Sequence, residues 1–203
     1  MSLLHLDASI LGGYSVSRDV SAAVTARLKA ANPGLKVVYR DLAANPVPHL
    51  SGATLAAAAA PEGHDPLVQA DVALGAEIMA EFKVADTIVI GAPMYNFSVP
   101  TQLKAWIDRI LVAGQTFRYT ENGVEGLAKG KRVIIALSRG GIYSGGAPAA
   151  PLDFQETYLR GVFGFIGITD VEFVRAEGIA LGPDQRQQAL DAAKSHAETL
   201  KAA

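Results

Sequence analysis

The sequence contains no cysteine among its 203 residues. This absence excludes disulfides, iron–sulfur clusters, thiolate metal sites and cysteine nucleophiles. An excess of charge of one sign is also missing, because 18 lysines and arginines face 20 aspartates and glutamates, which gives a net charge of −2. Such a balance, with both signs mixed along the chain, predicts no nucleic-acid partner.

Long hydrophobic runs and several familiar short motifs are absent as well. The longest apolar runs, such as residues 87–93, are far too short to span a bilayer, and residues 1–10 lack the basic start of a signal peptide. The chain contains no Gly-Lys-Ser/Thr, Gly-x-Gly-x-x-Gly, Gly-x-Ser-x-Gly or His-Glu-x-x-His motif, and its four histidines are scattered. We therefore expect a cytoplasmic protein with no membrane association and no metal site.

Half of the residues are hydrophobic, which is enough for a large core, and no linker divides the chain. We expect one domain over residues 1–203. Five short apolar segments alternate with five segments of helical periodicity, and a parallel sheet is the usual result of such alternation. The predicted strands are 3–7, 36–40, 87–90, 133–137 and 171–174, and the predicted helices are 17–31, 65–83, 103–111, 152–164 and 183–200.

Two further segments lie outside this alternation. Residues 56–60 are all alanine and are interpreted as either a surface helical turn or a mobile flap. Residues 116–129 alternate in polarity around Asn122-Gly123, which is typical of a small hairpin. The predicted fold class is therefore α/β, a doubly wound five-stranded parallel sheet with helices on both faces and an inserted hairpin.

Ligands of such sheets bind beyond the carboxyl ends of the strands, so three loops are candidates: the first loop (9–17), the second loop (92–98) and the third loop (138–146). In the first loop, Ser9, Ser15 and Ser17 precede a helix, where hydroxyl and backbone N–H groups can hold a phosphate. Simple helix capping by Ser15 or Ser17 is an equal alternative.

The second loop carries three bulky side chains in Met94-Tyr95-Asn96-Phe97, which could form a wall for a flat heterocycle. Alternatively, Tyr95 and Phe97 only close the core. The third loop starts with Ser138-Arg139-Gly140-Gly141, whose glycines allow a ligand to approach the backbone closely. Each of these two loops alone is a weak signal.

Together the loops resemble those of the FMN-dependent NADH azoreductases, a flavodoxin-like family of NAD(P)H:quinone and azo reductases. The resemblance covers most of the chain. Its matched segments are Ala8-Ser9-Ile10 with Gly13-Tyr14-Ser15, residues 40–46, residues 92–97, residues 116–123, Ser138-Arg139-Gly140-Gly141 and residues 164–169.

The resemblance implies an FMN site and assigns residues to it by position. Ser9, Ser15, Val16 and Ser17 would bind the FMN phosphate; Met94, Tyr95, Asn96 and Phe97 would lie along the isoalloxazine ring; and Ser138, Arg139, Gly140 and Gly141 would complete the site. Backbone N–H groups of the two glycines are candidates to stabilise negative charge on the reduced flavin. Family members are homodimers with residues of both subunits near each flavin.

The implied activity is an FMN-dependent NAD(P)H:quinone oxidoreductase with azoreductase activity, which transfers two electrons in a ping-pong cycle to small quinones or azo compounds. Tyr119 and Phe165 are candidates for the acceptor pocket, and core packing is the alternative for Phe165. The sequence does not decide between NADH and NADPH. The match is looser after Ile142, where Tyr143 replaces the family's histidine, and this leaves the acceptor open.

Two other classes of function compete with this interpretation. A flavodoxin-type electron carrier for a protein partner is the first, although a net charge of −2 gives little electrostatic steering toward such a partner. The second is a doubly wound binding or signalling module without flavin. Such a module would need a phosphoacceptor aspartate at a strand end, where this chain has Asp7.

Overall fold

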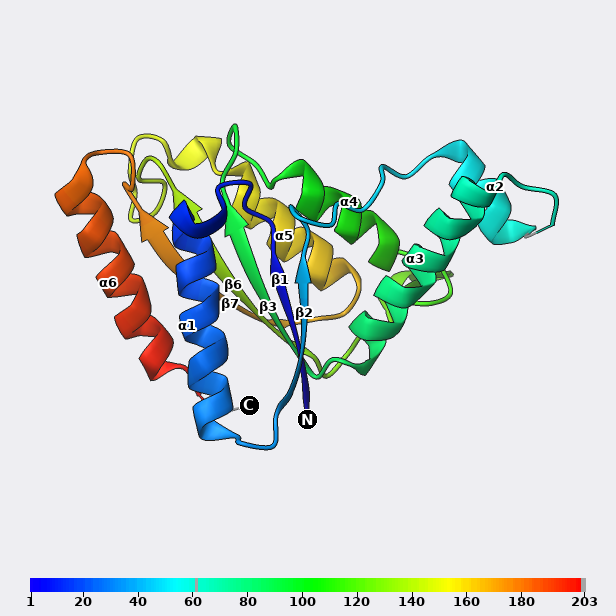
Figure 1. Ribbon diagram of the computed structural model, residues 1–203, viewed down its shortest axis with the longest axis horizontal. Coiled ribbons are helices and arrows are strands. Elements are labelled where there is room, and N and C mark those ends of the chain that lie inside the picture. Colours follow the sequence, from blue (N-terminus) through cyan, green and yellow to red (C-terminus); the bar gives the residue numbers. More distant parts are fainter. Residues whose placement is uncertain (61, 202–203) are drawn as a thin grey trace.

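Five parallel strands form the central sheet of the computed structural model, which describes residues 1–60 and 62–201 (Figure 1). The strands are β1 (Ser2–Asp7), β2 (Lys36–Asp41), β3 (Thr87–Pro93), β6 (Arg132–Arg139) and β7 (Asp170–Glu177), in the order β2-β1-β3-β6-β7. The chain moves outward from β1 to β2 and then returns to the other side of β1 as β3. The winding direction therefore switches between β1 and β3, where ligands bind in sheets of this type.

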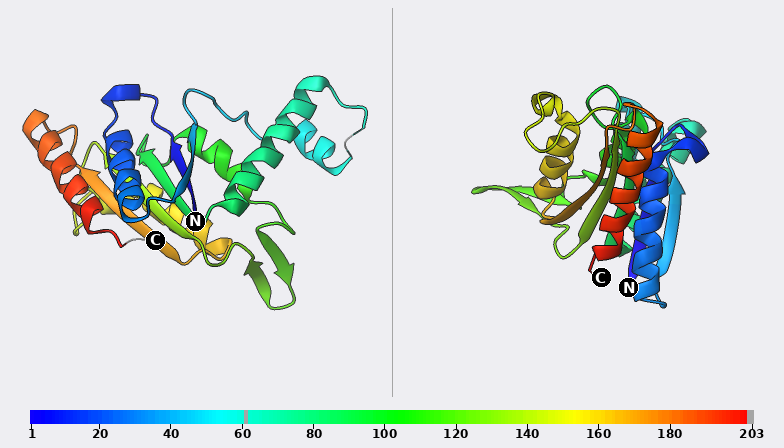
Figure 2. Two further views of the ribbon diagram at one scale, coloured as in Figure 1. Left: turned by 60° about the horizontal axis from the view of Figure 1, so that its bottom comes forward. Right: turned by 90° about the vertical axis from the view of Figure 1, so that its left-hand side faces the viewer.

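Alternate side chains of each strand face two different helical layers. Leu4, Leu6, Ile88 and Ile90 pack toward α3 (Pro66–Val84), α4 (Thr101–Ile110) and α5 (Phe154–Phe165). Leu3 and Val89 pack on the opposite face, toward α1 (Val16–Ala31) and α6 (Pro183–Thr199), which lie side by side in Figures 1 and 2. Burial on both faces explains why β1, β3 and β6 are mostly apolar, whereas the edge strand β2 has no fully buried residue. It confirms the predicted doubly wound sheet.

Short polar side chains fix the starts of α1, α3 and α5. Ser15 caps α1, Asp65 caps α3 with Pro66 in its first turn, and Asp153 caps α5 by accepting the N–H of Glu156 at 3.0 Å. Each side-chain oxygen satisfies a backbone N–H that has no partner inside its helix. The start of α3 at Asp65-Pro66 agrees with the sequence prediction.

The alanine-rich segment forms a helix of its own, α2 (Gly52–Ala59), which begins after its cap Ser51. Only Thr54 and Ala57 of this helix are buried, and α2 lies beside α3 at the outer end of the molecule in Figure 1. Surface placement was expected, but five helices were one too few: among the described residues α2 is a sixth α-helix. Two short 3-10 helices, η1 (Gly12–Tyr14) and η2 (Ala150–Leu152), precede α1 and α5.

The predicted hairpin is present as β4 (Phe117–Thr120) and β5 (Gly123–Gly126), which pair antiparallel and extend away from the central sheet (Figure 2). Its base is held against the loop that enters the amino end of β7, because Ala128 donates its N–H to the carbonyl of Ile166 at 2.8 Å. Gly126 is required at this contact, since a Cβ there would lie 2.2 Å from the nitrogen of Gly167.

The helices of residues 1–60 and 62–201 include none with both the length and the apolar character needed to cross a bilayer.

Candidate functional site

The first, second and third loops meet at the carboxyl ends of β1, β3 and β6. The hydroxyl of Tyr95 lies 3.3 Å from Oγ of Ser9 and accepts the N–H of Ile10 at 3.3 Å, which joins the second loop to the first. The N–H of Met94 donates to the carbonyl of Ser138 at 2.8 Å, which joins the second loop to the third. Candidates that lie far apart in the sequence therefore form one continuous rim.

The first loop ends in a cradle at the N-terminus of α1. Oγ of Ser15 accepts the N–H of Arg18 at 3.3 Å and lies 3.0 Å from Oγ of Ser17. The N–H groups of Val16 and Ser17 belong to the first helical turn, so they have no carbonyl partner within α1. Two hydroxyls, two N–H groups and the positive end of the helix dipole suit a phosphate dianion. Ser15 is also a cap, and this capping does not prevent it from binding an anion.

The second loop ends in a tight turn with unusual backbone angles. Tyr95 and Ser98 exchange two backbone hydrogen bonds of 3.1 Å, and between them Asn96 and Phe97 have φ values of 47° and 70°. Positive φ at both central positions is typical of a type I′ turn, and it is unfavourable for phenylalanine. Because the Phe97 side chain is 43% exposed, the proposal that Phe97 closes the core is wrong. The turn instead presents an aromatic side chain to solvent.

The second residue of the third loop is Arg139, whose side chain has no exposed surface. The guanidinium of Arg139 lies 2.8 Å from Asp153 and 3.1 Å from Glu177, two acidic side chains that are partly buried. It is therefore not available to a ligand, and any contact of Arg139 with a cofactor must come from its main chain. The carbonyls of Gly140 and Gly141 accept the N–H groups of residues 180 and 178, which fixes the two glycines beside the end of β7.

Gln155 connects the second and third loops, and the sequence analysis did not identify it. Its Nε2 donates to the carbonyls of Ala92 at 3.1 Å and Pro93 at 2.9 Å, and its Oε1 accepts from Nε of Arg139 at 3.3 Å. Gln155 lies on the buried side of α5, in the stripe formed with Leu159 and Val162. A polar residue in an apolar stripe was the signal that could have revealed it.

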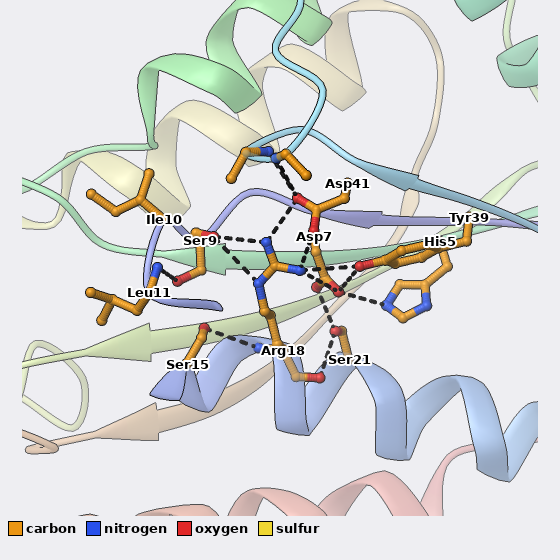
Figure 3. Close-up of polar contacts among 12 residues, drawn as sticks. His5, Asp7, Ser9, Ile10, Leu11, Ser15, Arg18, Ser21, Tyr39 and Asp41 are labelled. Atoms are coloured by element: carbon orange, nitrogen blue, oxygen red, sulfur yellow. Dashed lines mark hydrogen bonds and ion pairs between the residues drawn. The ribbon is translucent and has the colours of Figure 1, made fainter. Parts of the chain in front are cut away.

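Asp7 is the last residue of β1, just before the first loop, and is almost fully buried (Figure 3). Its Oδ1 accepts from the hydroxyl of Ser21 at 2.8 Å, and its Oδ2 accepts from the hydroxyl of Tyr39 at 3.1 Å. Burial, together with the charge of Asp7, raises the pKa of Tyr39 to about 12. A carboxylate with both oxygens bound inside the protein is poorly placed to accept a phosphoryl group, which disfavours the signalling-module alternative.

Tyr119 and Phe165 lie apart from the three loops within this chain. Both pack around Phe117, with ring centroids 5.6 Å and 4.8 Å from its own, near the base of the hairpin and the amino end of β7. Tyr119 is 75% exposed and Phe165 is 38% exposed. One chain alone therefore does not bring these two aromatics to the rim.

Comparison with known proteins gives consistent matches over nearly the whole chain. The family described as having a flavodoxin-like fold matches residues 1–200. A protein of Rhizobium meliloti (strain 1021) named FMN-dependent NADH:quinone oxidoreductase is 60% identical over 199 residues, which are 98% of this chain and 96% of that protein.

Solved structures also match nearly the whole chain. The crystal structure of azoreductase AzrA has a TM-score of 0.87 and 30% identity, and the match covers 98% of this chain and 97% of that one. A second structure, an FMN-dependent NADH-azoreductase from Bacillus anthracis str. Ames Ancestor in complex with FMN, has a TM-score of 0.85 and 28% identity, with 97% of each chain covered.

Proposed function

We propose that this chain, which belongs to the family with the flavodoxin-like fold, is an FMN-dependent NADH:quinone oxidoreductase. The observation that carries the proposal is the rim itself. A hydroxyl-lined helix N-terminus and a strained aromatic turn are joined at the point where the winding of the sheet switches. Relatives about 60% identical over nearly the whole chain carry the name of this activity.

The residues of the rim match the chemistry of FMN in three places. The hydroxyls of Ser15 and Ser17 and the N–H groups at the start of α1 would hold the phosphate. The turn at Asn96 and Phe97 would lie along the isoalloxazine ring, and main-chain N–H groups of the third loop would face its polar edge. FMN, when bound, accepts a hydride equivalent from NADH and passes two electrons to a quinone.

The proposal includes a homodimer in the cytoplasm that also reduces azo compounds. The neighbouring structures are named as azoreductases, which supports azo compounds as further acceptors. The exposed aromatic pair of Tyr119 and Phe165 supports the dimer. These side chains lie away from the rim of their own chain, so a second subunit would have to bring them to the flavin. Light scattering on the purified protein, with twice the chain mass expected, tests the dimer.

Turnover without a protein partner separates this proposal from a flavodoxin-type carrier. Purified chain loaded with FMN is mixed with NADH and a small soluble quinone, and NADH absorbance is followed at 340 nm. We expect rapid NADH oxidation that depends on both FMN and quinone. Oxidation that begins only after a redox protein is added would favour the carrier.

A further inference from the structure

Arg18 closes the base of the first loop with its side chain (Figure 3). The residue lies in the first turn of α1, and its Nε and Nη2 donate to the carbonyl of Ser9 at 3.3 Å and 2.8 Å. Ser9 is the first residue of the first loop, and Arg18 is the residue directly after the loop ends. This contact therefore fixes the two ends of the loop relative to each other.

Asp41 holds the guanidinium in place from the end of β2. Nη1 and Nη2 of Arg18 lie 2.7 Å and 2.8 Å from the two carboxylate oxygens, a fork-to-fork arrangement. The carboxylate is itself anchored, because its Oδ1 also accepts the N–H groups of Ala43 at 2.9 Å and Ala44 at 3.0 Å. Through Arg18 and Asp41, the first loop is anchored to β2, the edge strand of the central sheet.

The surroundings of Arg18 neutralise its charge. Asp41 pairs with the guanidinium directly, and Asp7 lies 3.7 Å from Nη1, so one cation faces two carboxylates. Nη1 also donates to the hydroxyl of Tyr39 at 3.1 Å. Such a compensated arginine offers little net attraction to an anion. Its contribution to a phosphate site must be geometric.

We infer that Arg18, held by Asp41, is a positioning residue that makes the first loop selective for phosphorylated flavin. The inference rests on the proposed function. With Ser9 and α1 fixed relative to each other, the hydroxyls of Ser15 and Ser17 and the N–H groups of their turn converge before FMN arrives. A preorganised loop loses less conformational entropy on binding, and this gain applies only to ligands that carry the phosphate.

Comparison of FMN with riboflavin tests this inference, because riboflavin lacks only the phosphate. Quenching of flavin fluorescence gives the Kd of both ligands for flavin-free wild type, Arg18→Met and Arg18→Lys. We expect both variants to bind FMN about 10-fold or more weakly, as the loss of charge-assisted hydrogen bonds implies, and to keep riboflavin affinity within about twofold. Lysine keeps the charge but not the planar fork, so it should not rescue binding.

Two further variants complete the design. Arg27→Met is the matched control, because Arg27 is also on α1 but donates to the carbonyl of Glu198, far along the helix from the loop; its FMN affinity should equal that of wild type. Asp41→Asn removes the charge of the partner of Arg18 but keeps its shape. This variant is used in place of Arg18→Met if circular dichroism shows that Arg18→Met is unfolded.

Several results would overturn the inference. The first is an FMN affinity that is unchanged in both Arg18→Met and Asp41→Asn. The second is an equal loss of affinity for FMN and for riboflavin. The third is wild-type FMN affinity in Arg18→Lys, which would mean that Arg18 acts through its charge. A wild type that binds no FMN is a separate result. It contradicts the proposed function before any variant is measured, and the inference falls with it.

Discussion

At the scale of single residues, buried polar side chains hold the rim together. The amide of Gln155 uses its two N–H groups on the carbonyls of Ala92 and Pro93 and its oxygen on Arg139. Arg139 in turn binds Asp153 and Glu177. A satisfied buried network of this kind specifies one arrangement of the loops, and removal of a member leaves each of its partners with one hydrogen bond fewer.

Gln155→Leu is expected to destabilise the protein by about 3 kcal/mol, because it removes the hydrogen-bond partner of the Pro93 carbonyl and of the Nε of Arg139 in the core, and removes one hydrogen bond to the Ala92 carbonyl. FMN affinity should fall as well, since the second and third loops lose their connection. Urea unfolding followed by circular dichroism measures the first effect. Gln187→Leu on the exposed face of α6 is the control, with an expected change below about 0.5 kcal/mol. Equal stability of the two variants would contradict this role of Gln155.

Asp41 gives a prediction about pH. Hydrogen bonds from Arg18 lower the pKa of Asp41 from 3.8 to about 2 in the folded protein. A folded pKa below the unfolded one means that the ion pair stabilises the protein above about pH 4 and that this contribution disappears toward pH 2. The difference in melting temperature between wild type and Asp41→Asn should therefore be largest near pH 6. It should decrease toward zero as the pH falls from 4 to 2. The same difference at every pH would contradict the assignment, and Asp191→Asn on the surface serves as control.

Residue type and spacing identified part of the rim in advance. Ser9, Ser15 and Ser17 were predicted because hydroxyls before a helix are a local feature. Arg18, Asp41 and Gln155 were not, because their roles depend on partners distant in the chain. Arg18 binds a carboxylate 23 positions away, and Gln155 binds carbonyls 62 and 63 positions away.

At the scale of elements, the turn in the second loop is the clearest sign of function. Its two-residue geometry requires positive φ at Asn96 and Phe97. Asparagine tolerates this left-handed region of the backbone, whereas a phenylalanine there lowers the stability of the folded protein by about 1–2 kcal/mol. A strained residue that is also exposed contributes little to the stability of the fold. We therefore interpret the presence of phenylalanine at position 97 as a contact surface for a ligand.

Phe97→Asn should raise the free energy of unfolding of the flavin-free protein by about 0.5–1 kcal/mol, because asparagine tolerates the left-handed region. The same variant should bind FMN more weakly, since the aromatic surface beside the flavin is lost. Urea unfolding and fluorescence titration measure the two effects. Phe154→Asn, at a similarly exposed aromatic with helical backbone, should show no gain in stability. A loss of stability in Phe97→Asn would contradict the strain argument.

Strands and capped helices were predictable because their signals are local. Continuous apolar runs marked β3 and the middle of β6, shorter apolar runs marked the other three strands, and Asp65-Pro66 marked the start of α3. The existence of α2 was not decided by its sequence. Alanine favours helix but gives no apolar face of any size, and the contacts that place α2 come from Thr54, which donates to Asp71 on α3 at 2.7 Å.

At the scale of the whole molecule, the residues predicted for the site lie in two separate regions of the chain: the three loops at the carboxyl ends of the strands, and Tyr119 with Phe165 near the hairpin. The alternation of strands and helices was enough to predict the parallel sheet and the edge where ligands bind. It could not place Tyr119 and Phe165 relative to that edge, because the hairpin leaves the sheet at its amino end. In the homodimer proposed above, the relation of the hairpin to the rim would depend on how the two subunits pack.

Tyr119→Ala tests this division. If the hairpin of one subunit completes the acceptor pocket of the other, the variant should change kcat/KM for quinones by about threefold or more and leave FMN affinity within about twofold. Steady-state kinetics with several quinones measure the first quantity. Val124→Ala is the matched control, because Val124 is paired with Tyr119 in the same hairpin. Kinetic constants equal to wild type for all quinones would contradict the assignment.

The central claim, that the rim binds FMN for two-electron transfer, is tested most directly by one anaerobic titration. The purified chain is saturated with FMN, freed of excess cofactor and titrated with NADH while the flavin absorbance near 450 nm is followed. We predict one FMN per chain and complete bleaching at one NADH per FMN. A protein that stays colourless after incubation with FMN, or a bound flavin that NADH does not bleach, would contradict the account.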